Sequence, residues 1–489
     1  MSSNLIARSK YTKGPRETGG LSCFGPPGLT SPVAAAFCAP NLGDNGHRGQ
    51  TMQQAIGAVI LAFYLALMAL LAPVARLVLA RRAARGREDR LRWREKLGVA
   101  GAARPGGQLI WLHAASVGEL ASVVGLVAAL CNARPGVALL VTTSTETSAR
   151  LAAERLPAPV LHQYLPLDLP GAVARFLDHW RPDVAVWVES EFWPRLIERT
   201  AARNIPMVLV NARMSDRSAR RWQKVRGLAQ RLLGHFGQVF AQDAQTARHL
   251  AALGLPPERL HALGSLKETA APLPFDTAER DRLAGLWAGR PRWLAASTHA
   301  GEETAVLAAH RIAKRAMPDL LLILAPRHPE RGAAVAAEAR AAGFALAMRA
   351  GGLGEAATAD VYLADTLGEM GLWFNLAPIA FLGGSLAPIG GHNPYEPVAQ
   401  GAAVVHGPHV GNFREIYTRL AAAGGAREVA GADALADALG QLLANGAAAA
   451  RAQGEAARAV VSANGEATRN AMLAGIFTAL DSPAGRRWL

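Results

Sequence analysis

The stretch GGSLAPIGGHNPYEP, residues 383–397, directly follows the apolar run PIAFL at residues 378–382. The apolar run is typical of a buried strand, the glycines of a tight turn, and Asn-Pro-Tyr-Glu of a helix start. Glycines let backbone N–H groups approach an anion closely, and a helix N-terminus adds about half a positive charge. Strand, turn and helix together predict an anion cradle, in which Glu396 can accept hydrogen bonds from ribose hydroxyls.

A second turn, DTLGEMG at residues 365–371, also stands where a predicted strand gives way to a helix. It contains Gly368, Glu369 and Met370. One glycine-rich turn is common in proteins, but two such turns with carboxylates in one half of a chain favour a nucleotide-sugar site.

An alternation of short apolar runs, turns and helical patterns extends through most of the chain. The predicted strands are Leu109–His113, Ala138–Thr143, Asp183–Glu189, Met207–Asn211, Val239–Gln242, Arg292–Ala296, Leu320–Ala325, Asp360–Ala364, Pro378–Leu382 and Ala402–His406. A Pro-containing linker at residues 270–274 divides them into two sets. Such alternation predicts parallel sheets with crossover helices, so we expect two Rossmann-like domains, with ligand in a cleft faced by both sets of strand ends.

The composition narrows the class of protein. The chain has 489 residues, enough for two domains, and a formal net charge of +14, which predicts anionic partners. Its three cysteines have no metal-binding spacing and favour a reducing compartment without structural zinc. The basic residues gather beside one apolar segment, with no aromatic and basic platform, which argues against nucleic acid as a partner.

That apolar segment, AIGAVILAFYLALMALLAPVA at residues 55–75, is uncharged and long enough to cross a bilayer. A crowd of Arg and Lys residues follows it, which predicts by the positive-inside bias that the downstream chain is cytoplasmic. A cleaved signal peptide would have its basic flank on the other side. We expect a single-pass or monotopic anchor helix over residues 52–80. Residues 1–51, without periodicity, predict a disordered extension, and Met52 is a candidate translation start.

Charged side chains stand at the ends of several predicted strands. Glu119, in HAASVGE, opens a helix after the first strand, where it can act as a general base or simply complement the helix N-terminus. Glu189 and Glu191 are two residues apart, which predicts that both lie on one face of an extended backbone. Lys267, in GSLKE near the linker, can neutralise a phosphate or a sugar carboxylate, although most lone lysines are solvated surface.

The second half contains two more turns of this kind, STHAGEE at residues 297–303 and APRHPER at residues 325–331. In the latter, Arg327 can donate two hydrogen bonds to a phosphate, or can be an ordinary loop arginine.

Nine motifs in order resemble those of the 3-deoxy-D-manno-octulosonic acid (Kdo) transferases: HAASVGE, TTSTETSA, ESEFWP, NARMSDRS, GSLKE, STHAGEE, APRHPER, DTLGEMG and GGSLAPIGGHNPYEP. The resemblance runs from the apolar segment, through WREKLG at residues 93–98, to near the C-terminus. Ser265 stands where the family often has Asn, Tyr395 stands where it often has Leu, and residues 1–51 match nothing in it. The resemblance implies an α/β GT-B fold behind the membrane helix, with an acceptor domain over residues 81–270 and a CMP-sugar-binding domain over residues 271–489.

The same resemblance implies the activity. Kdo would be moved from CMP-Kdo to the anionic lipid A precursor, lipid IVA, in lipopolysaccharide biosynthesis on the cytoplasmic side of the inner membrane. The transfer would be inverting and would need neither a metal ion nor a cofactor. Glu119 would be the general base on the glucosamine hydroxyl, and Glu189 and Lys267 would stabilise the charge that shifts as CMP departs. CMP would be held by Arg327, His328, Gly368, Glu369, Met370, Asn393, Pro394, Tyr395 and Glu396.

Two alternatives stay open from the residues alone. A GT-B transferase or epimerase that uses a UDP-sugar would share the glycine-rich turn and the ribose-binding carboxylate. A membrane-tethered nucleotide-binding or lipid-binding protein without catalysis would share the anchor and the basic charge.

Overall fold

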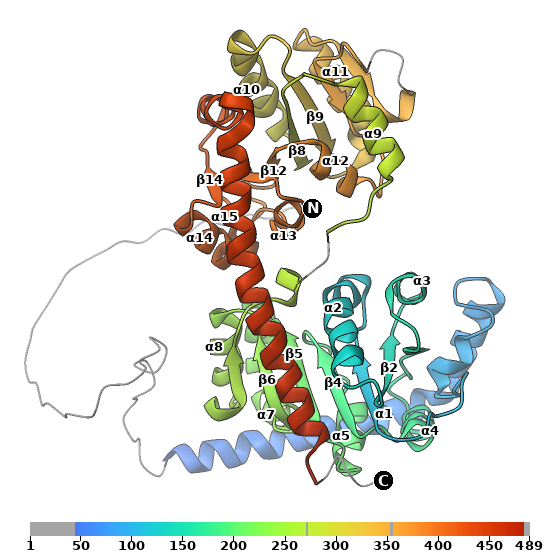
Figure 1. Cartoon of the computed structure of the whole chain (residues 1–489). Coiled ribbons are helices and arrows are strands. Elements are labelled where there is room, and N and C mark those ends of the chain that lie inside the picture. The colour runs from blue at the N-terminus through green and yellow to red at the C-terminus, as the bar shows by residue number, and fades with distance from the viewer. Residues whose placement is uncertain (1–44, 270–271, 353–355, 484–489) are drawn as a thin grey trace, which may run out of the picture. The chain divides into compact units, whose positions relative to one another are not determined.

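A computed structural model of the chain describes residues 45–269, 272–352 and 356–483 (Figure 1). It contains two parallel seven-stranded sheets. The first has the order β3-β2-β1-β4-β5-β6-β7 and the second the order β10-β11-β9-β8-β12-β13-β14. The strands of the first sheet are β1 (Leu109–His113), β2 (Ala138–Thr143), β3 (Leu161–Tyr164), β4 (Val184–Val188), β5 (Met207–Ala212), β6 (Phe236–Ala241) and β7 (Leu260–Ala262). Those of the second are β8 (Arg292–Thr298), β9 (Leu321–Pro326), β10 (Leu346–Met348), β11 (Val361–Leu363), β12 (Ile379–Leu382), β13 (Ala403–His406) and β14 (Ala426–Glu428).

Helices connect the parallel strands, as crossover connections require. In the first half they are α2 (Val117–Ala133), α3 (Glu146–Arg155), α4 (Pro170–Trp180), α5 (Pro194–Ala202), α6 (Asp216–Gln223), α7 (Arg226–Leu233) and α8 (Ala244–Ala252). In the second half they are α9 (Thr277–Leu286), α10 (Glu302–Ala316), α11 (Gly332–Ala341), α12 (Met370–Leu376), α13 (Tyr395–Gln400), α14 (Arg414–Ala422) and α15 (Ala432–Leu480). Several begin at a Ser, Thr or Asp whose side chain accepts a backbone N–H of the first turn, as Ser116, Thr145 and Asp243 do.

Both faces of each sheet are covered by buried apolar side chains. The central strands β1 and β4 are therefore buried at every residue, and His113 at the end of β1 is their one residue that is not apolar. In the first sheet, Trp111 and Trp187 face one cluster while Ile110 and Val186 face the other.

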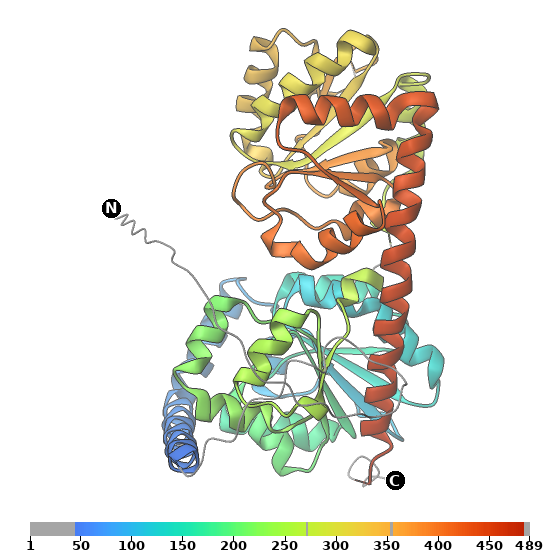
Figure 2. The same cartoon turned by 90° about the vertical axis from the view of Figure 1, so that its left-hand side faces the viewer.

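The long helix α15 belongs to the cores of both sheets (Figures 1 and 2). Its beginning, with Leu435 and Leu439, packs on the second sheet. Its end, with Met472, Ile476 and Leu480, packs on the first. Non-helical backbone angles at residues 444–447 bend the helix between these two parts.

A helix precedes the first sheet, α1 (Asn45–Ala84), followed by the short helix η2 (Trp93–Leu97). Among the described residues, Met52–Ala84 is the one helical stretch whose length and apolar composition would suffice to cross a membrane. Figure 1 shows α1, in blue, beside α5 and α7 of the first half. The helix begins seven residues before the expected Met52, so residues 45–51 of the predicted disordered extension are helical, and residues 1–44 lie outside the described part of the chain.

All ten predicted strands are present, with ends shifted by at most three residues. Four further strands were missed: β3, β7, β10 and β14. They occupy the four edge positions of the two sheets. Edge strands are short here, three or four residues each, and they lack the continuous apolar pattern of strands buried on both faces.

Candidate active site

Glu119 lies in the first turn of α2, where it forms a reciprocal cap with Ser116. Its backbone N–H donates to Ser116 Oγ (3.3 Å), and the Ser116 hydroxyl donates to Glu119 Oε1 (3.1 Å). The N–H of Ala115 donates to the other carboxylate oxygen (2.7 Å). The residue is 8% exposed. Glu119 therefore does complement the helix N-terminus, which was one of its two expected roles.

The other role, general base, is supported by the electrostatics of the same carboxyl group. Burial raises the pKa of Glu119 to about 7, against the opposing effect of the Ala115 N–H, and the negative charges of Glu189 and Glu191 raise it further. A carboxylate with a pKa near neutrality binds a proton far more readily than an exposed one, which general base catalysis requires. The cap therefore fixes the position of a carboxylate whose pKa suits proton transfer.

Glu189 follows β4 with a φ of +57°, in the left-handed region. The backbone is therefore turned at this residue, and the expectation of an extended segment was wrong. Both carboxylates nevertheless lie close enough to Glu119 to raise its pKa. Burial also raises the pKa of Glu191. Asn211 in β5 and Ser297 in β8 have similar positive φ values near their strand ends, and such strain in non-glycine residues is concentrated at functional sites.

Lys267, Arg327 and Glu396 form a second group of charges. Burial raises the pKa of the Glu396 carboxyl, while the Asn393 side chain and the charges of Arg327 and Lys267 lower it. The Asn393 amide donates to Glu396 Oε1 (3.0 Å) and so orients the carboxylate. Lys267 lies in the short helix η4 (Leu266–Thr269), and Arg327 directly follows β9 and is exposed. This group combines two cations with one carboxylate, as a nucleotide phosphate and its ribose would require.

The glycine-rich turn after β12 does form an anion cradle, but its occupant is a side chain of the protein and not the predicted phosphate. Its amides at residues 384–387 all donate to the carboxylate of Glu302, at distances of 2.6 to 3.3 Å. The N–H of His299 donates to the same carboxylate (3.0 Å). Glu302, buried at 1% exposure in the first turn of α10, thus occupies the cradle expected to receive a phosphate. The motif STHAGEE contained this residue, but the sequence did not predict that it would reach across to the turn.

Three histidines lie together near that turn. The rings of His299 and His392 are stacked at 5.1 Å, with their Nε2 atoms 2.8 Å apart, and His328 meets His299 edge to face. Burial lowers the pKa of His392 to about 4, and the neighbouring His299 and Arg327 lower it further. His328 is exposed beside Arg327. Only His328 was among the predicted binding residues, and the pairing of His299 with His392 was missed because 93 residues separate them.

The remaining predicted binding residues have other partners. The N–H of Tyr395 donates to Asn393 Oδ1 (3.0 Å), and Pro394 is buried. The Tyr395 hydroxyl points to Glu268 (3.4 Å), whose carboxylate also accepts hydrogen bonds from Arg419 and Asn464. The Glu268 side chain therefore joins η4 to α13, α14 and α15.

In the turn before α12, the Glu369 carboxylate is paired with the Arg349 guanidinium (2.6 and 3.0 Å) and accepts a hydrogen bond from the Thr366 hydroxyl. Gly368 has a φ of +86°, which suits a glycine, and Met370 packs partly into the core of the second sheet. The Glu369 carboxylate is thus held by Arg349 and Thr366, which leaves it less available to a ligand.

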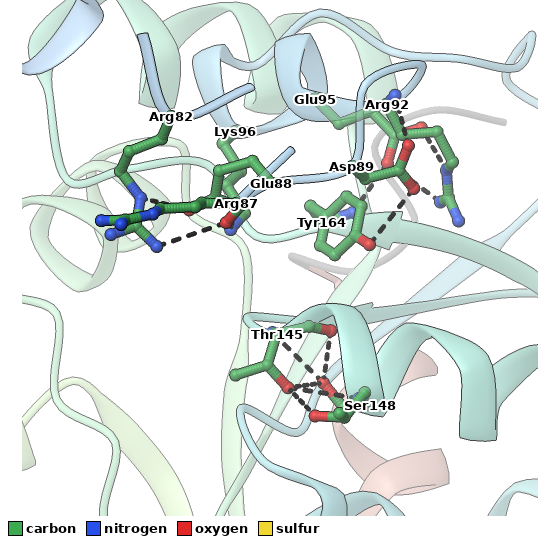
Figure 3. Close-up of polar contacts among 11 residues, drawn as sticks. Arg82, Arg87, Glu88, Asp89, Arg92, Glu95, Lys96, Thr145, Ser148 and Tyr164 are labelled. Atoms are coloured by element: carbon green, nitrogen blue, oxygen red, sulfur yellow. Dashed lines mark hydrogen bonds and ion pairs between the residues drawn. The ribbon is translucent and has the colours of Figure 1, made fainter. Parts of the chain in front are cut away.

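Two of the family-like motifs have structural roles (Figure 3). In TTSTETSA, Thr145 and Ser148 form the capping box at the start of α3. Beside WREKLG, Arg92 donates to the His162 carbonyl (2.9 Å) and Glu95 accepts the Tyr164 N–H (2.9 Å), so this segment covers the free edge of β3. A cavity of about 480 Å³ lies here, lined by Arg92, His162 and Trp180 among others, and none of the predicted site residues lines it.

Comparison with known proteins bears on this arrangement. The family model for 3-deoxy-D-manno-octulosonic-acid transferase (kdotransferase) matches residues 91–270. A 3-deoxy-D-manno-octulosonic acid transferase of Haemophilus influenzae is 39% identical over 357 residues, which are 72% of this chain and 84% of that protein. Another, of Bordetella pertussis, is 36% identical over 398 residues, which are 77% of this chain and 89% of that protein.

Among solved structures, a glycosyltransferase of Rickettsia africae superimposes with a TM-score of 0.53 at 12% identity, covering 77% of this chain and all of its own. At that identity the likeness concerns the fold alone, and it confirms the predicted GT-B architecture of two parallel α/β sheets. The 39% and 36% identities to the two curated relatives, over most of their length, are high enough to show the family. The chain belongs to the 3-deoxy-D-manno-octulosonic acid transferases, a family of glycosyltransferases.

Proposed function

We propose that this chain transfers Kdo from CMP-Kdo to the lipid A precursor lipid IVA, with inversion and without a metal ion, on the cytoplasmic side of the inner membrane. Membership of the Kdo transferase family supports the sugar and the type of reaction. The observation that carries the mechanism is Glu119, a buried carboxylate with a pKa raised to about 7. Its position is fixed by the cap with Ser116 and Ala115.

In the proposed reaction, Glu119 accepts the proton of the glucosamine hydroxyl while that oxygen attacks the anomeric carbon of Kdo. The bond from this carbon to the CMP phosphate breaks, and the phosphate takes the electron pair. Repulsion by Glu189 and Glu191 favours the protonated form of Glu119, so their charges assist the proton transfer. Lys267 and Arg327 offset the negative charge that develops on the leaving phosphate.

The donor would be held by the second half of the chain. Arg327 and His328, both exposed after β9, would pair with phosphate oxygens. Glu396, oriented by Asn393, would accept hydrogen bonds from the ribose hydroxyls. The backbone of residues 368–370 would complete the site, because the Glu369 side chain already has partners within the protein. Pro394 and Tyr395 would shape the site without donating to the ligand, because the Tyr395 N–H and hydroxyl have partners as well.

The proposed acceptor and α1 support a membrane location. Lipid IVA stays in the bilayer, and Met52–Ala84 has a mean hydropathy of 2.6 over its most apolar window. Exposed arginines directly after α1, including Arg85 and Arg90, would be attracted to anionic lipid and to the phosphates of the acceptor.

The test is an assay of the purified full-length chain with CMP-Kdo and lipid IVA, with the lipid product weighed by mass spectrometry. A mass gain of one or more Kdo units is expected. Glu119→Gln should lower the rate of this gain about 10²–10⁴-fold, and Glu154→Gln, which changes an exposed glutamate of α3, should leave the rate unchanged. UDP-sugars serve as the competing donors. Transfer from a UDP-sugar but not from CMP-Kdo would refute CMP-Kdo as the donor. A Glu119→Gln variant that keeps most of the wild-type rate would refute Glu119 as the general base.

A further inference from the structure

Helix α1 has two apolar stripes on opposite sides, and both recur with the period of an α-helix. One stripe is covered by the first half of the chain: Gly57, Leu61, Tyr64, Met68, Leu79 and Ala83. The other is exposed: Met52, Val59, Phe63, Leu70, Val74 and Leu77. Phe63 and Leu70 are 69% and 76% exposed, whereas Leu61 and Leu79 are 3% and 5% exposed. Because both faces are apolar, the sequence of α1 alone is indistinguishable from that of a transmembrane helix.

The covered stripe makes close backbone contact with α7. A Cβ added to Gly227 would lie 1.8 Å from the carbonyl oxygen of Gln53, and one added to Gly57 would lie 2.4 Å from the carbonyl carbon of Gly227. No larger residue fits at either position without separating the helices. Glycines at such a crossing let two helix backbones approach each other closely.

A polar contact fastens the middle of α1. The Tyr64 hydroxyl donates to Asp168 Oδ2 (2.8 Å), and Asp168 also accepts the N–H groups of Arg195 and Leu196 at the start of α5 (2.9 and 2.8 Å). The Arg195 guanidinium in turn donates to the Leu65 carbonyl of α1. Asp168 and Arg195 are 5% and 8% exposed. Separating α1 from the first half would break the hydrogen bonds that these two buried charged groups form with α1.

The length of the covered stripe decides how α1 can meet a membrane. From Gly57 to Ala83 the helix rises about 39 Å, more than the roughly 30 Å of a bilayer's hydrocarbon core. Were α1 to span the bilayer in its docked position, α5 and α7 would enter the hydrocarbon with it. These helices carry the exposed Arg199 and the ion pair of Arg231 with Glu198, which are costly to bury in lipid. Docking and spanning therefore exclude each other.

We propose that α1 lies in the plane of the membrane surface, docked on the first half of the chain by one stripe and inserted among the lipids of an anionic bilayer by the other. The lipid class follows from charge. Arg81, Arg85, Arg87 and Arg90, at and after the end of α1, are exposed and form no ion pair within the described residues. Leu91, 92% exposed, adds an apolar contact beside them. An in-plane helix with a basic flank binds anionic membranes by this combination of insertion and attraction.

The experiment measures the depth of the exposed stripe in the full-length protein, reconstituted in vesicles of phosphatidylethanolamine and phosphatidylglycerol. A single nitroxide is attached in turn at Val59, Phe63, Leu70 and Val74, with the native cysteines replaced by serine. An in-plane helix places all four labels at one depth, about 5–10 Å below the surface. A spanning helix instead separates the labels at Val59 and Val74 by about 22 Å along the bilayer normal. That gradient would overturn the proposal.

A matched pair of alanines tests the docking itself. Ala66→Cys lies on the exposed side and Ala72→Cys on the partly covered side, six residues along α1. The first should react with a lipid-soluble maleimide at least tenfold faster, and equal rates would show that α1 is undocked. Vesicles of phosphatidylcholine alone should bind the protein more weakly than the anionic vesicles. Equal binding would refute the role of the exposed arginines in selecting anionic lipid.

This inference rests on the membrane attachment proposed above but not on the chemistry. Lipid product is therefore measured in the same vesicles. Uniform depth without Kdo transfer would refute the proposed function alone, and a depth gradient with intact transfer would refute the in-plane helix alone.

Discussion

Replacing Glu119 with Gln should separate catalysis from stability. The amide keeps the size of the side chain and can still complete the cap of α2, because Gln serves at this position as Glu does. It cannot accept the proton of the acceptor hydroxyl. Loss of a general base typically lowers the rate about 10²–10⁴-fold, so kcat should fall by that factor while CMP affinity stays near that of the wild type.

The same substitution should stabilise the fold at high pH. The rise of the Glu119 pKa from 4.5 to about 7 corresponds to about 3 kcal/mol against the ionised form. The neighbouring Glu189 and Glu191, which contribute part of the shift, are partly exposed, and solvent screening reduces the expected effect to about 1–2 kcal/mol. Because the folded pKa is the higher one, protonation of Glu119 favours folding. That contribution is complete below pH 4.5 and is lost as the pH rises through 7.

The assay is thermal unfolding followed by tryptophan fluorescence at pH 8.5 and pH 4.5, beside the pH profile of kcat/KM. We expect Glu119→Gln to unfold at a higher temperature than the wild type at pH 8.5 and at nearly the same temperature at pH 4.5. Wild-type kcat/KM should rise with pH up to about 7 and then level off. A Gln variant that is less stable at pH 8.5, or a rate that does not change between pH 5 and pH 8, would refute the reasoning.

Three further outcomes are expected. Arg327→Ala and Glu396→Ala should each weaken CMP binding by about 1–3 kcal/mol in titration calorimetry. The control Arg340→Ala, which changes an exposed residue of α11, should leave the CMP affinity unchanged. An unaltered affinity in either of the first two variants would exclude that residue from the site. Glu302→Gln should lower the free energy of unfolding in urea by about 1–3 kcal/mol, because backbone amides of the glycine-rich turn lose a charged acceptor. A change below about 0.5 kcal/mol, the size of an ordinary surface effect, would show that the turn does not depend on the Glu302 charge. EDTA should leave turnover unchanged, and a loss restored by a divalent cation would contradict the metal-free mechanism.

The sequence predicted the strands at the centre of each sheet because burial on both faces demands an unbroken apolar run, as in LIWLH of β1 and VAVWV of β4. It did not predict β3 or β14, since LHQY and ARE carry polar residues that an edge position tolerates. The in-chain partner of the glycine-rich turn was missed for a different reason. Local pattern identifies donors that need an acceptor, but Glu302 lies 82 residues before Gly384, and only the fold joins them.

The candidate site was predictable where one turn contains all its parts. Ser116 and Glu119 form their cap within four residues, so the position of Glu119 followed from HAASVGE. Its raised pKa depends first on burial and then on Glu189 and Glu191, some 70 residues away. The orientation of Tyr395 toward Glu268 depends on the packing of η4 against the second half, 127 residues along the chain, which no local pattern contains. The roles of the predicted site residues in binding and catalysis stay predictions until the variants are measured.

The end of α15 packs on the first sheet but is synthesised long after that sheet, which has a consequence for folding during synthesis. Met472, Ile476 and Leu480 cover apolar residues of the first sheet such as Ile110 and Leu112, and Gly475 lies against Phe240. A ribosome adds about 5–20 residues per second, so the roughly 200 residues between β7 and the end of α15 take about 10–40 s to appear. During that interval the first half has all its strands but not its full covering. The nascent chain thus exposes an apolar sheet face until its last helix is made, which is the kind of surface that chaperones bind.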